Sequence, residues 1–266
     1  MPVPKPAVTF DLWHTLVYLE PEAEEGYMRH QVEAAVQVLE TSQMVGNASR
    51  ASAEELRAAF EKEYADAVQA AGEGRTVTPA EQLSRAAEAT GRVPRPDAYL
   101  AALERAVATT AFRQAPDALP VLRELGESGY TIGVISNTIG EPGRFLRPIL
   151  HRMGFDDLVD QYTFSDEHPW TKPAPEIFDS ALRGLDSDPS VAVHVGDGWS
   201  DIEGARRARM RGSILFTGLQ QYGERYRVLF LPAGWDHPPA DHRASALREV
   251  VPIVRRLVPT PRNGIR

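Results

Sequence analysis

The spacing of hydrophobic and polar positions changes character twice along the chain. Residues 7–10, Ala-Val-Thr-Phe, form a short apolar and β-branched run that ends at Asp11, as in a buried strand of a parallel sheet. From about 20 to 110, apolar residues recur with helical spacing within alanine- and glutamate-rich segments. Because about four helices follow the first strand with no second strand between them, we predict an inserted helical segment.

Two positions in this segment have the spacing of a capping box, which marks the start of a helix. Ser52 stands three residues before Glu55, and Thr78 stands three residues before Glu81. In a capping box the hydroxyl accepts a hydrogen bond from the N3 backbone, and the acid accepts one from the backbone of the cap residue. We therefore expect helices to begin just after Ser52 and Thr78.

After Pro116 the pattern becomes an alternation of strands and helices. Such alternation implies right-handed crossovers and a parallel sheet, so the predicted fold class is α/β, with a doubly wound, Rossmann-like core and an inserted α-helical domain. The residues of 218–241 fit no element, and we expect a long connection packed on the sheet. The expected elements are helix 117–127, strand 130–135, helix 142–153, an extended piece 161–164, helix 174–184, strand 191–195, helix 199–210, strand 213–216 and a helix near 242–257.

The composition narrows the classes of function. The 266 residues are 42% hydrophobic, which is enough for a real core, and carry a net charge of -8. A basic face that would bind nucleic acid or an anionic membrane is therefore not expected. There is no cysteine, which excludes disulfides, thiolate metal sites and a cysteine nucleophile. With no apolar run that resembles a secretion signal or a membrane span, the protein is expected to be soluble and cytoplasmic.

Polar residues stand at the ends of four expected strands. Because the carboxyl ends of parallel strands meet at one edge of a sheet, three carboxylates should gather there and face one lysine. Like charges repel, so such a cluster implies a bound cation, and oxygen-only ligands favour magnesium over zinc or copper. The residues are Asp11 and Thr15 after the first strand, Ser136 and Asn137 after the second, Lys172 after the extended piece, and Asp197 and Asp201 after the next strand.

The order of the segments DLWHT, ISN, TKP and GDGWSD resembles the four motifs of the haloacid dehalogenase superfamily of hydrolases. The resemblance extends from about 7 to 217, and it is closest in the third and fourth motifs. Many members of that superfamily insert a helical cap after the first motif. By this resemblance, residues 1–16 and 114–266 form the catalytic core, and residues 17–113 form the helical cap.

The resemblance implies a role for each motif residue. Asp11 would be the nucleophile that becomes covalently substituted, with Thr15 supporting its loop. Ser136 would hydrogen-bond the transferred group, and Asn137 next to it belongs to the same catalytic set. Lys172 would neutralise the nucleophile and the charge that develops in the reaction.

The resemblance also implies a metal site. Magnesium would be held by Asp11, by the backbone carbonyl of Trp13, and by Asp197 and Asp201, which would ligate or orient it. An attacking carboxylate needs such a cation to reduce its repulsion from an anionic substrate.

Trp13 departs from the pattern of the superfamily's phosphatases. They usually carry a second aspartate two residues after the nucleophile, as general acid and base, and an indole cannot move that proton. The superfamily's dehalogenases have an aromatic residue here, commonly tyrosine, but they work without metal and have Ser and Asn where this chain has Asp197 and Gly198.

Three functions therefore remain open. We favour a magnesium-dependent phosphatase that acts on a small, anionic phosphorylated metabolite through an aspartyl-phosphate. The first alternative is a metal-independent 2-haloacid dehalogenase that works through an aspartyl-ester. The second is a low-activity or non-catalytic binding protein with the same fold. A monomer and a homodimer are both compatible with the sequence.

Several titratable residues near the motifs are further candidates for a role in the site. Glu20 or Glu22 could return a carboxylate to the pocket. By the resemblance, His14 should face away from the substrate. His194 lies inside an apolar strand and is expected to be a core histidine with satisfied ring nitrogens. Lys62, in a charged run, is expected on the solvated face of its helix.

Overall fold

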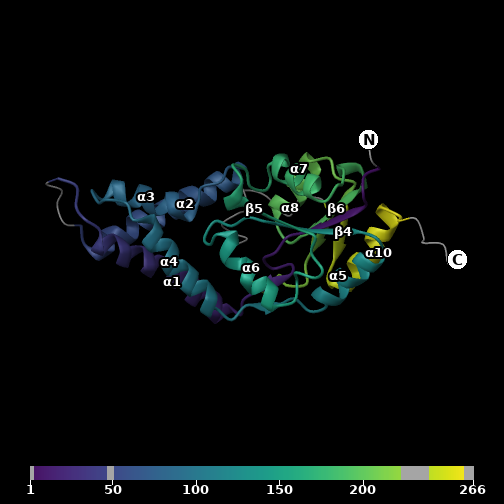
Figure 1. Cartoon of the computed structure of the whole chain (residues 1–266), viewed down its shortest axis with the longest axis horizontal. Helices are drawn as coiled ribbons and strands as arrows, with labels where there is room; N and C mark the ends of the chain where they lie inside the picture. The colour runs from purple at the N-terminus through teal and green to yellow at the C-terminus, as the bar shows by residue number, and fades with distance from the viewer. Residues whose placement is uncertain (1–2, 47–50, 223–239, 261–266) are drawn as a thin grey trace.

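A six-stranded parallel sheet forms the centre of the structure, a computed structural model that describes residues 3–46, 51–222 and 240–260 (Figure 1). The strand order is β5-β4-β1-β6-β7-β8, and every neighbouring pair runs parallel. This confirms the predicted α/β class. The strands are β1 (Ala7–Phe10), β4 (Thr131–Ser136), β5 (Gln161–Phe164), β6 (Ala192–Gly196), β7 (Gly212–Phe216) and β8 (His242–Ala244).

Helices cover both faces of this sheet. Helices α7 and α8 pack together against one face, where they contact β4 to β7, and α5 and α10 pack together on the other. The crossover elements are α5 (Ala118–Glu127), α6 (Gly143–Arg152), η1 (Ser165–Glu167), α7 (Pro175–Gly184), η2 (Pro189–Val191), α8 (Trp199–Arg207) and α10 (Leu247–Leu257). The connections reverse direction at β1, which lies between β4 and β6, and such a switch point places strand ends around a crevice.

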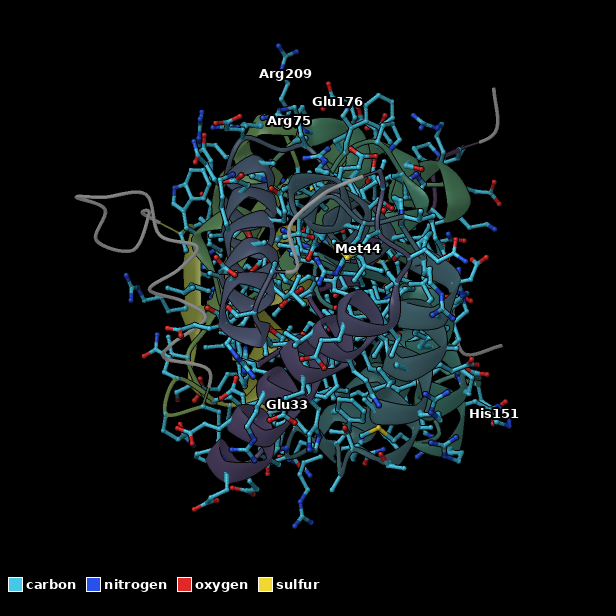
Figure 2. The ribbon with its side chains drawn as sticks, turned by 90° about the vertical axis from the view of Figure 1, so that its left-hand side faces the viewer. Glu33, Met44, Arg75, His151, Glu176 and Arg209 are labelled. Carbon is cyan, nitrogen blue, oxygen red and sulfur yellow. The ribbon has the colours of Figure 1, made fainter. Side chains whose placement is uncertain are left out.

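The helical segment follows β1 and lies to one side of the sheet, at the left in Figure 1. Figure 2 views the molecule from that side. The core of the helical segment includes Phe60 and Tyr99. Both are almost fully buried, and their rings meet edge to face with centroids 5.4 Å apart. The helices are α1 (Pro21–Thr41), α2 (Ala53–Gly72), α3 (Pro79–Ala89) and α4 (Pro96–Thr109).

Both expected capping boxes are present. The hydroxyls of Ser52 and Thr78 accept from the backbones of Glu55 and Glu81, whose carboxylates accept in return from the cap backbones at 2.7 Å. Helices α2 and α3 therefore begin where the sequence placed them. This agreement reflects the local nature of the signal, because four consecutive residues contain all of the bonding groups.

A two-stranded antiparallel ribbon joins the helical segment to the sheet domain and was not predicted. Strands β2 (Val17–Tyr18) and β3 (Arg113–Gln114) pair with Val17 opposite Gln114. Two residues per strand are too few to show an alternating pattern, so the ribbon could not be predicted from periodicity. The ribbon brings the entry and the exit of the helical segment side by side.

The largest error in the predicted boundaries is at the last helix, and the helix predicted for 199–210 also ends earlier, at Arg207. The helix expected near 242–257 begins at Leu247, and residues 242–244 form the edge strand β8 instead. Pairing with β7 overrides the helical pattern, and the Asp241 carboxylate fixes the register by accepting from the backbone of Ser213 at 2.8 Å. Most of the connection predicted for 218–241 lies outside the described residues.

None of the helices in the described part of the chain is both long enough and apolar enough to cross a bilayer.

Candidate active site

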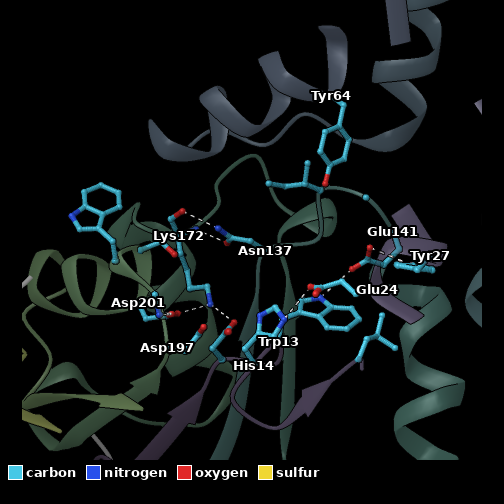
Figure 3. Close-up of a pocket in the computed structure, with 17 residues that line it drawn as sticks. Trp13, His14, Glu24, Tyr27, Tyr64, Asn137, Glu141, Lys172, Asp197 and Asp201 are labelled. Carbon is cyan, nitrogen blue, oxygen red and sulfur yellow. Dashed lines mark hydrogen bonds and ion pairs between the residues drawn. The ribbon is translucent and has the colours of Figure 1, made fainter. Parts of the chain in front are cut away.

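A cavity of about 130 Å³ lies at the carboxyl ends of β1, β4 and β6, beside the helical segment (Figure 3). Glu24 and Tyr27 of α1 and Tyr64 of α2 reach it from the helical segment. The remaining lining residues come from the loops that follow the strands and from the start of α8. Six of the sequence-predicted site residues line it, namely Asp11, Trp13, Asn137, Lys172, Asp197 and Asp201.

The charged centre of the cavity is built around Lys172. Its ammonium group contacts a carboxylate oxygen of Asp11, and it donates to Oδ1 of Asp201 at 2.6 Å. One ligand oxygen from each of Asp11, Asp197 and Asp201 lies within 4.8 Å of the others, and all three residues are buried. The structure therefore brings together the three carboxylates and the lysine that are separated by up to 190 positions in the sequence.

Burial dominates the electrostatics of this centre. It raises the pKa of Asp11 to about 7, a change that Lys172 opposes and that Asp201 and Asp197 reinforce. Burial alone would lower the pKa of Lys172, but the two carboxylates in contact with it raise the value instead, so the ammonium stays protonated. Three carboxylates thus share one fixed positive charge, which leaves room for a cation to stabilise the ionised form of Asp11.

The Asp201 carboxylate contacts three groups of the protein, namely Lys172, His194 and the backbone of Gly198. Burial would raise its pKa, but Lys172 and a hydrogen bond from His194 hold it below its usual value. The backbone N–H of Gly198 donates to its other oxygen at 2.9 Å. A Cβ on Gly196 would lie 2.2 Å from Cγ of Asp201, so a glycine is required there for the carboxylate to fit.

His194 is a core histidine, as the sequence predicted, and it also positions the site. Its ring is fully buried in β6, and burial lowers its pKa, so the ring is neutral. Nε2 lies 3.1 Å from Asp201 Oδ1 and Nδ1 lies 2.8 Å from the Thr9 hydroxyl. A neutral ring that donates to the carboxylate through Nε2 accepts from Thr9 through Nδ1, which fixes the tautomer.

Asn137 connects two of the motif loops. Its side-chain amide donates to the backbone carbonyl of Lys172 at 3.0 Å and accepts from the backbone N–H of Lys172 at 2.9 Å. This pair of bonds ties the loop after β4 to the loop that carries the lysine. Asn137 therefore holds Lys172 in position through the backbone of Lys172.

Ser136 and Thr15 are both fully buried, and neither is among the residues that line the cavity. Their hydroxyl oxygens have no hydrogen-bond partner among the described residues. Burying a hydroxyl without a hydrogen-bond partner costs free energy. A hydroxyl that makes its hydrogen bond only when substrate is present would account for this observation. Ser136 is the last residue of β4, directly before Asn137.

The sequence did not identify Glu141, which contacts Trp13. The indole Nε1 donates to Oε1 of Glu141 at 3.1 Å, and the Tyr27 hydroxyl donates to Oε2 at 3.4 Å. Burial raises the pKa of Glu141 to about 8. The only local signal was the place of Glu141 in the loop after the second motif, since its partners are 114 and 128 positions away.

The acids expected to enter the pocket are not the ones found there. Among the described residues, Glu24 lines the cavity, whereas Glu20 and Glu22 do not. The expectation for His14 was also wrong, because its side chain lines the cavity, with Nε2 3.4 Å from Glu24. Burial would lower the pKa of His14, but Glu24 raises it. Lys62 lies on the exposed face of α2 and pairs with a neighbouring aspartate, as predicted.

A doubly wound sheet with a charged site at its switch point and a helical segment after the first strand defines a class of α/β proteins. A family model for haloacid dehalogenase-like hydrolases matches residues 5–209. The match covers most of the chain, and the chain belongs to this family of hydrolases.

Curated relatives match over shorter stretches. The glyceraldehyde 3-phosphate phosphatase of Pyrococcus abyssi is 38% identical over 101 residues, which are 38% of this chain and 41% of the relative. The human haloacid dehalogenase-like hydrolase domain-containing protein 3 is 34% identical over 132 residues, or 49% of this chain and 47% of the relative. The chain therefore matches less than half the length of these two relatives.

Solved structures agree with the fold over nearly the whole chain. A HAD phosphatase from Thermococcus onnurineus has a TM-score of 0.61 at 22% identity, covering 93% of this chain and 97% of its own. A 2-haloacid dehalogenase from Pseudomonas syringae pv. Tomato has a TM-score of 0.62 at 22% identity, covering 95% and 99%. A phosphatase and a dehalogenase are thus equally similar, so the likeness defines the fold and leaves the reaction open.

Proposed function

We propose that this chain is a magnesium-dependent phosphatase that hydrolyses a small phosphorylated metabolite through a phosphorylated Asp11. The observation that carries the proposal is the buried triad of Asp11, Asp197 and Asp201. A metal-independent dehalogenase would have no use for this triad, because like charges in a buried site repel one another. Relatives named as phosphatases support the same reaction.

The donor set fits magnesium, since it consists of oxygen atoms. Asp11 and Asp197 would each offer a carboxylate oxygen, and Trp13 would offer its backbone carbonyl. Both oxygens of Asp201 already accept hydrogen bonds from the protein, so Asp201 would ligate or orient the ion from a fixed position. A cation bound there would neutralise negative charge on the phosphoryl oxygens.

In the proposed reaction an oxygen of Asp11 attacks phosphorus in line while the bond from phosphorus to the leaving oxygen breaks. The leaving oxygen takes up a proton, and water then attacks the phosphoaspartate, which releases inorganic phosphate and restores Asp11. The Lys172 ammonium stabilises negative charge next to Asp11, and the Ser136 hydroxyl would donate to a phosphoryl oxygen. Thr15 would support the loop that carries the nucleophile.

Residues 17–113 would act as the cap, and residues 1–16 and 114–266 as the catalytic core. Two hydrogen bonds support this arrangement, because they join the helical segment to the loops of the site. The Gln82 side chain donates to the backbone of Ile139 at 2.8 Å, and the Thr76 hydroxyl donates to the backbone of Ser165 at 3.0 Å. A cap in this position would exclude water and select the leaving group.

A 2-haloacid dehalogenase is the second candidate, and Trp13 is the observation that favours it. Halide leaves without protonation, so an indole in place of the second aspartate would cost that reaction nothing. If the chain is a phosphatase, Trp13 cannot protonate the leaving oxygen. We therefore expect phosphate esters with good leaving groups to react faster than those with poor ones.

The test is phosphate release from para-nitrophenyl phosphate and acetyl phosphate, with magnesium and with chelator, beside chloride release from L-2-chloropropionate. We expect phosphate release that chelator abolishes and that is lost in Asp11→Asn and Asp197→Asn. Asp66→Asn, a substitution on the outer face of α2, is the matched control. Chloride release that is indifferent to chelator would instead establish the dehalogenase, and the absence of both activities would favour a binding protein.

A further inference from the structure

The end of the cavity away from the charged centre is lined by aromatic and acidic side chains. Figure 3 shows Tyr27, Tyr64, Glu24 and Glu141 on the side opposite Lys172, Asp197 and Asp201, with Trp13 between the two groups. We call Trp13, Glu24, Tyr27, Tyr64 and Glu141 the leaving-group wall. If Asp11 attacks phosphorus, the alcohol part of the substrate must point toward this wall.

The leaving-group wall would repel a second acidic group on the substrate. Among the described residues that line the cavity, the basic side chains are Lys172 and His14. Lys172 is already shared by two carboxylates of the charged centre, and His14 lies against Glu24. A carboxylate or a second phosphate on the leaving group would therefore meet Glu24 with no further described lysine or arginine to neutralise it.

The same wall would attract a cation. Glu141 is only 6% exposed and has no ion-pair partner among the described residues, and its two oxygens are held in place by Trp13 and Tyr27. A buried carboxyl fixed by two donors is a pre-organised acceptor for an ammonium group. The rings of Trp13, Tyr27 and Tyr64 line the same space, and aromatic faces attract ammonium groups.

We propose that the substrate is the phosphate monoester of an alcohol that carries an ammonium group and no second acidic group, with Glu141 as the residue that selects it. This inference rests on the proposed phosphatase function. Primary and quaternary ammonium groups both meet this description, and substrates of both kinds are included in the test.

The test compares kcat/KM for phosphoethanolamine and phosphocholine with that for phosphoglycolate, using the full chain with magnesium and para-nitrophenyl phosphate as reference. We expect at least one of the two ammonium substrates to exceed phosphoglycolate by about tenfold or more, the scale of one hydrogen bond to a charged group. Glu141→Gln keeps the shape and should lower that ratio about tenfold, mainly through KM. If the role of Glu141 were purely structural, Glu141→Gln would change kcat/KM for all substrates alike.

Glu176→Gln is the matched control, because Glu176 lies on the outer surface (Figure 2) and its substitution should leave the ratio unchanged. A preference for phosphoglycolate, or a ratio that Glu141→Gln does not alter, overturns the inference and leaves the phosphatase intact. If para-nitrophenyl phosphate and acetyl phosphate are not hydrolysed at all, the proposed function fails and the inference fails with it.

Discussion

At the scale of single residues, Trp13 separates this site from those of phosphatases that carry a second aspartate after the nucleophile. Its indole packs against Phe112, with ring centroids 5.5 Å apart, and donates to Glu141. The residue therefore shapes the leaving-group wall and positions an acid there. Any proton that reaches the leaving oxygen must come from a group other than residue 13.

We expect Trp13→Asp to increase kcat/KM on glycerol 2-phosphate, a poor leaving group, relative to acetyl phosphate, a good one. The ratio should rise by about tenfold or more, because a positioned general acid is typically worth ~10² to 10⁴ in rate. Trp13→Phe is the control, since it removes the N–H without adding an acid, and it should not raise the ratio. An unchanged ratio in Trp13→Asp would contradict the prediction.

Gly196 provides a second prediction at this scale. In Gly196→Ala the new Cβ would overlap Asp201, so the carboxylate must move away from Lys172. We expect phosphatase activity and magnesium affinity to fall ~10- to 100-fold, as for loss of a residue that orients a metal site. Gly126→Ala in α5 is the control, because a Cβ there meets nothing within 4 Å. Full activity in Gly196→Ala would show that the position of Asp201 is not critical.

At the scale of elements, the sequence predicted features that depend on neighbouring residues and missed features that depend on tertiary pairing. The starts of α2 and α3 were predicted because the capping groups are neighbours in the chain. The strand β8 and the β2–β3 ribbon were missed, because two or three residues show no periodicity and their pairing partners lie 28 and about 97 positions away. Short elements of this kind are defined by their partners.

We expect Thr78→Ala to lower the free energy of unfolding by about 1 kcal/mol, because the hydroxyl that caps α3 is lost. Urea denaturation followed by circular dichroism measures the effect as a lower midpoint. Thr78→Ser retains the hydroxyl and should remain close to the unsubstituted protein. If the two variants lost equal stability, the capping bond would not be the cause.

At the scale of the whole molecule, the sheet domain supplies the charged centre and the helical segment supplies part of the leaving-group wall. The ribbon of β2 and β3 returns the chain to the sheet domain, so one cavity is lined by both units. In the proposed phosphatase the reacting groups would lie in the sheet domain, and substrate choice would depend on residues of both units. A cation bound at the centre should stabilise the whole fold, since Asp11 follows β1 whereas Asp197 and Asp201 follow β6.

We expect magnesium to raise the midpoint of thermal unfolding. At a concentration 100 times its dissociation constant the ion would contribute about 2.7 kcal/mol, or several degrees in a chain of this size. Asp197→Asn should remove most of this shift, whereas Asp66→Asn should retain it. A midpoint that is the same with magnesium and with chelator would count against the metal site without reference to activity.

The sequence by itself determined the class of fold, the order of its main elements and the charged centre. It could do so because parallel strands end at one edge of a sheet, which brings residues after different strands together whatever the details of packing. Asp11, Lys172, Asp197 and Asp201 meet for this reason.

Only the tertiary structure decided what surrounds that centre. The contact of Glu141 with Trp13, the pairing of His14 with Glu24 and the return of the helical segment depend on distances across the fold. No periodicity or spacing encodes such contacts, because they are set by how side chains from separate elements pack around a shared cavity. The character of the leaving-group wall, and the substrate inferred from it, follow from that packing.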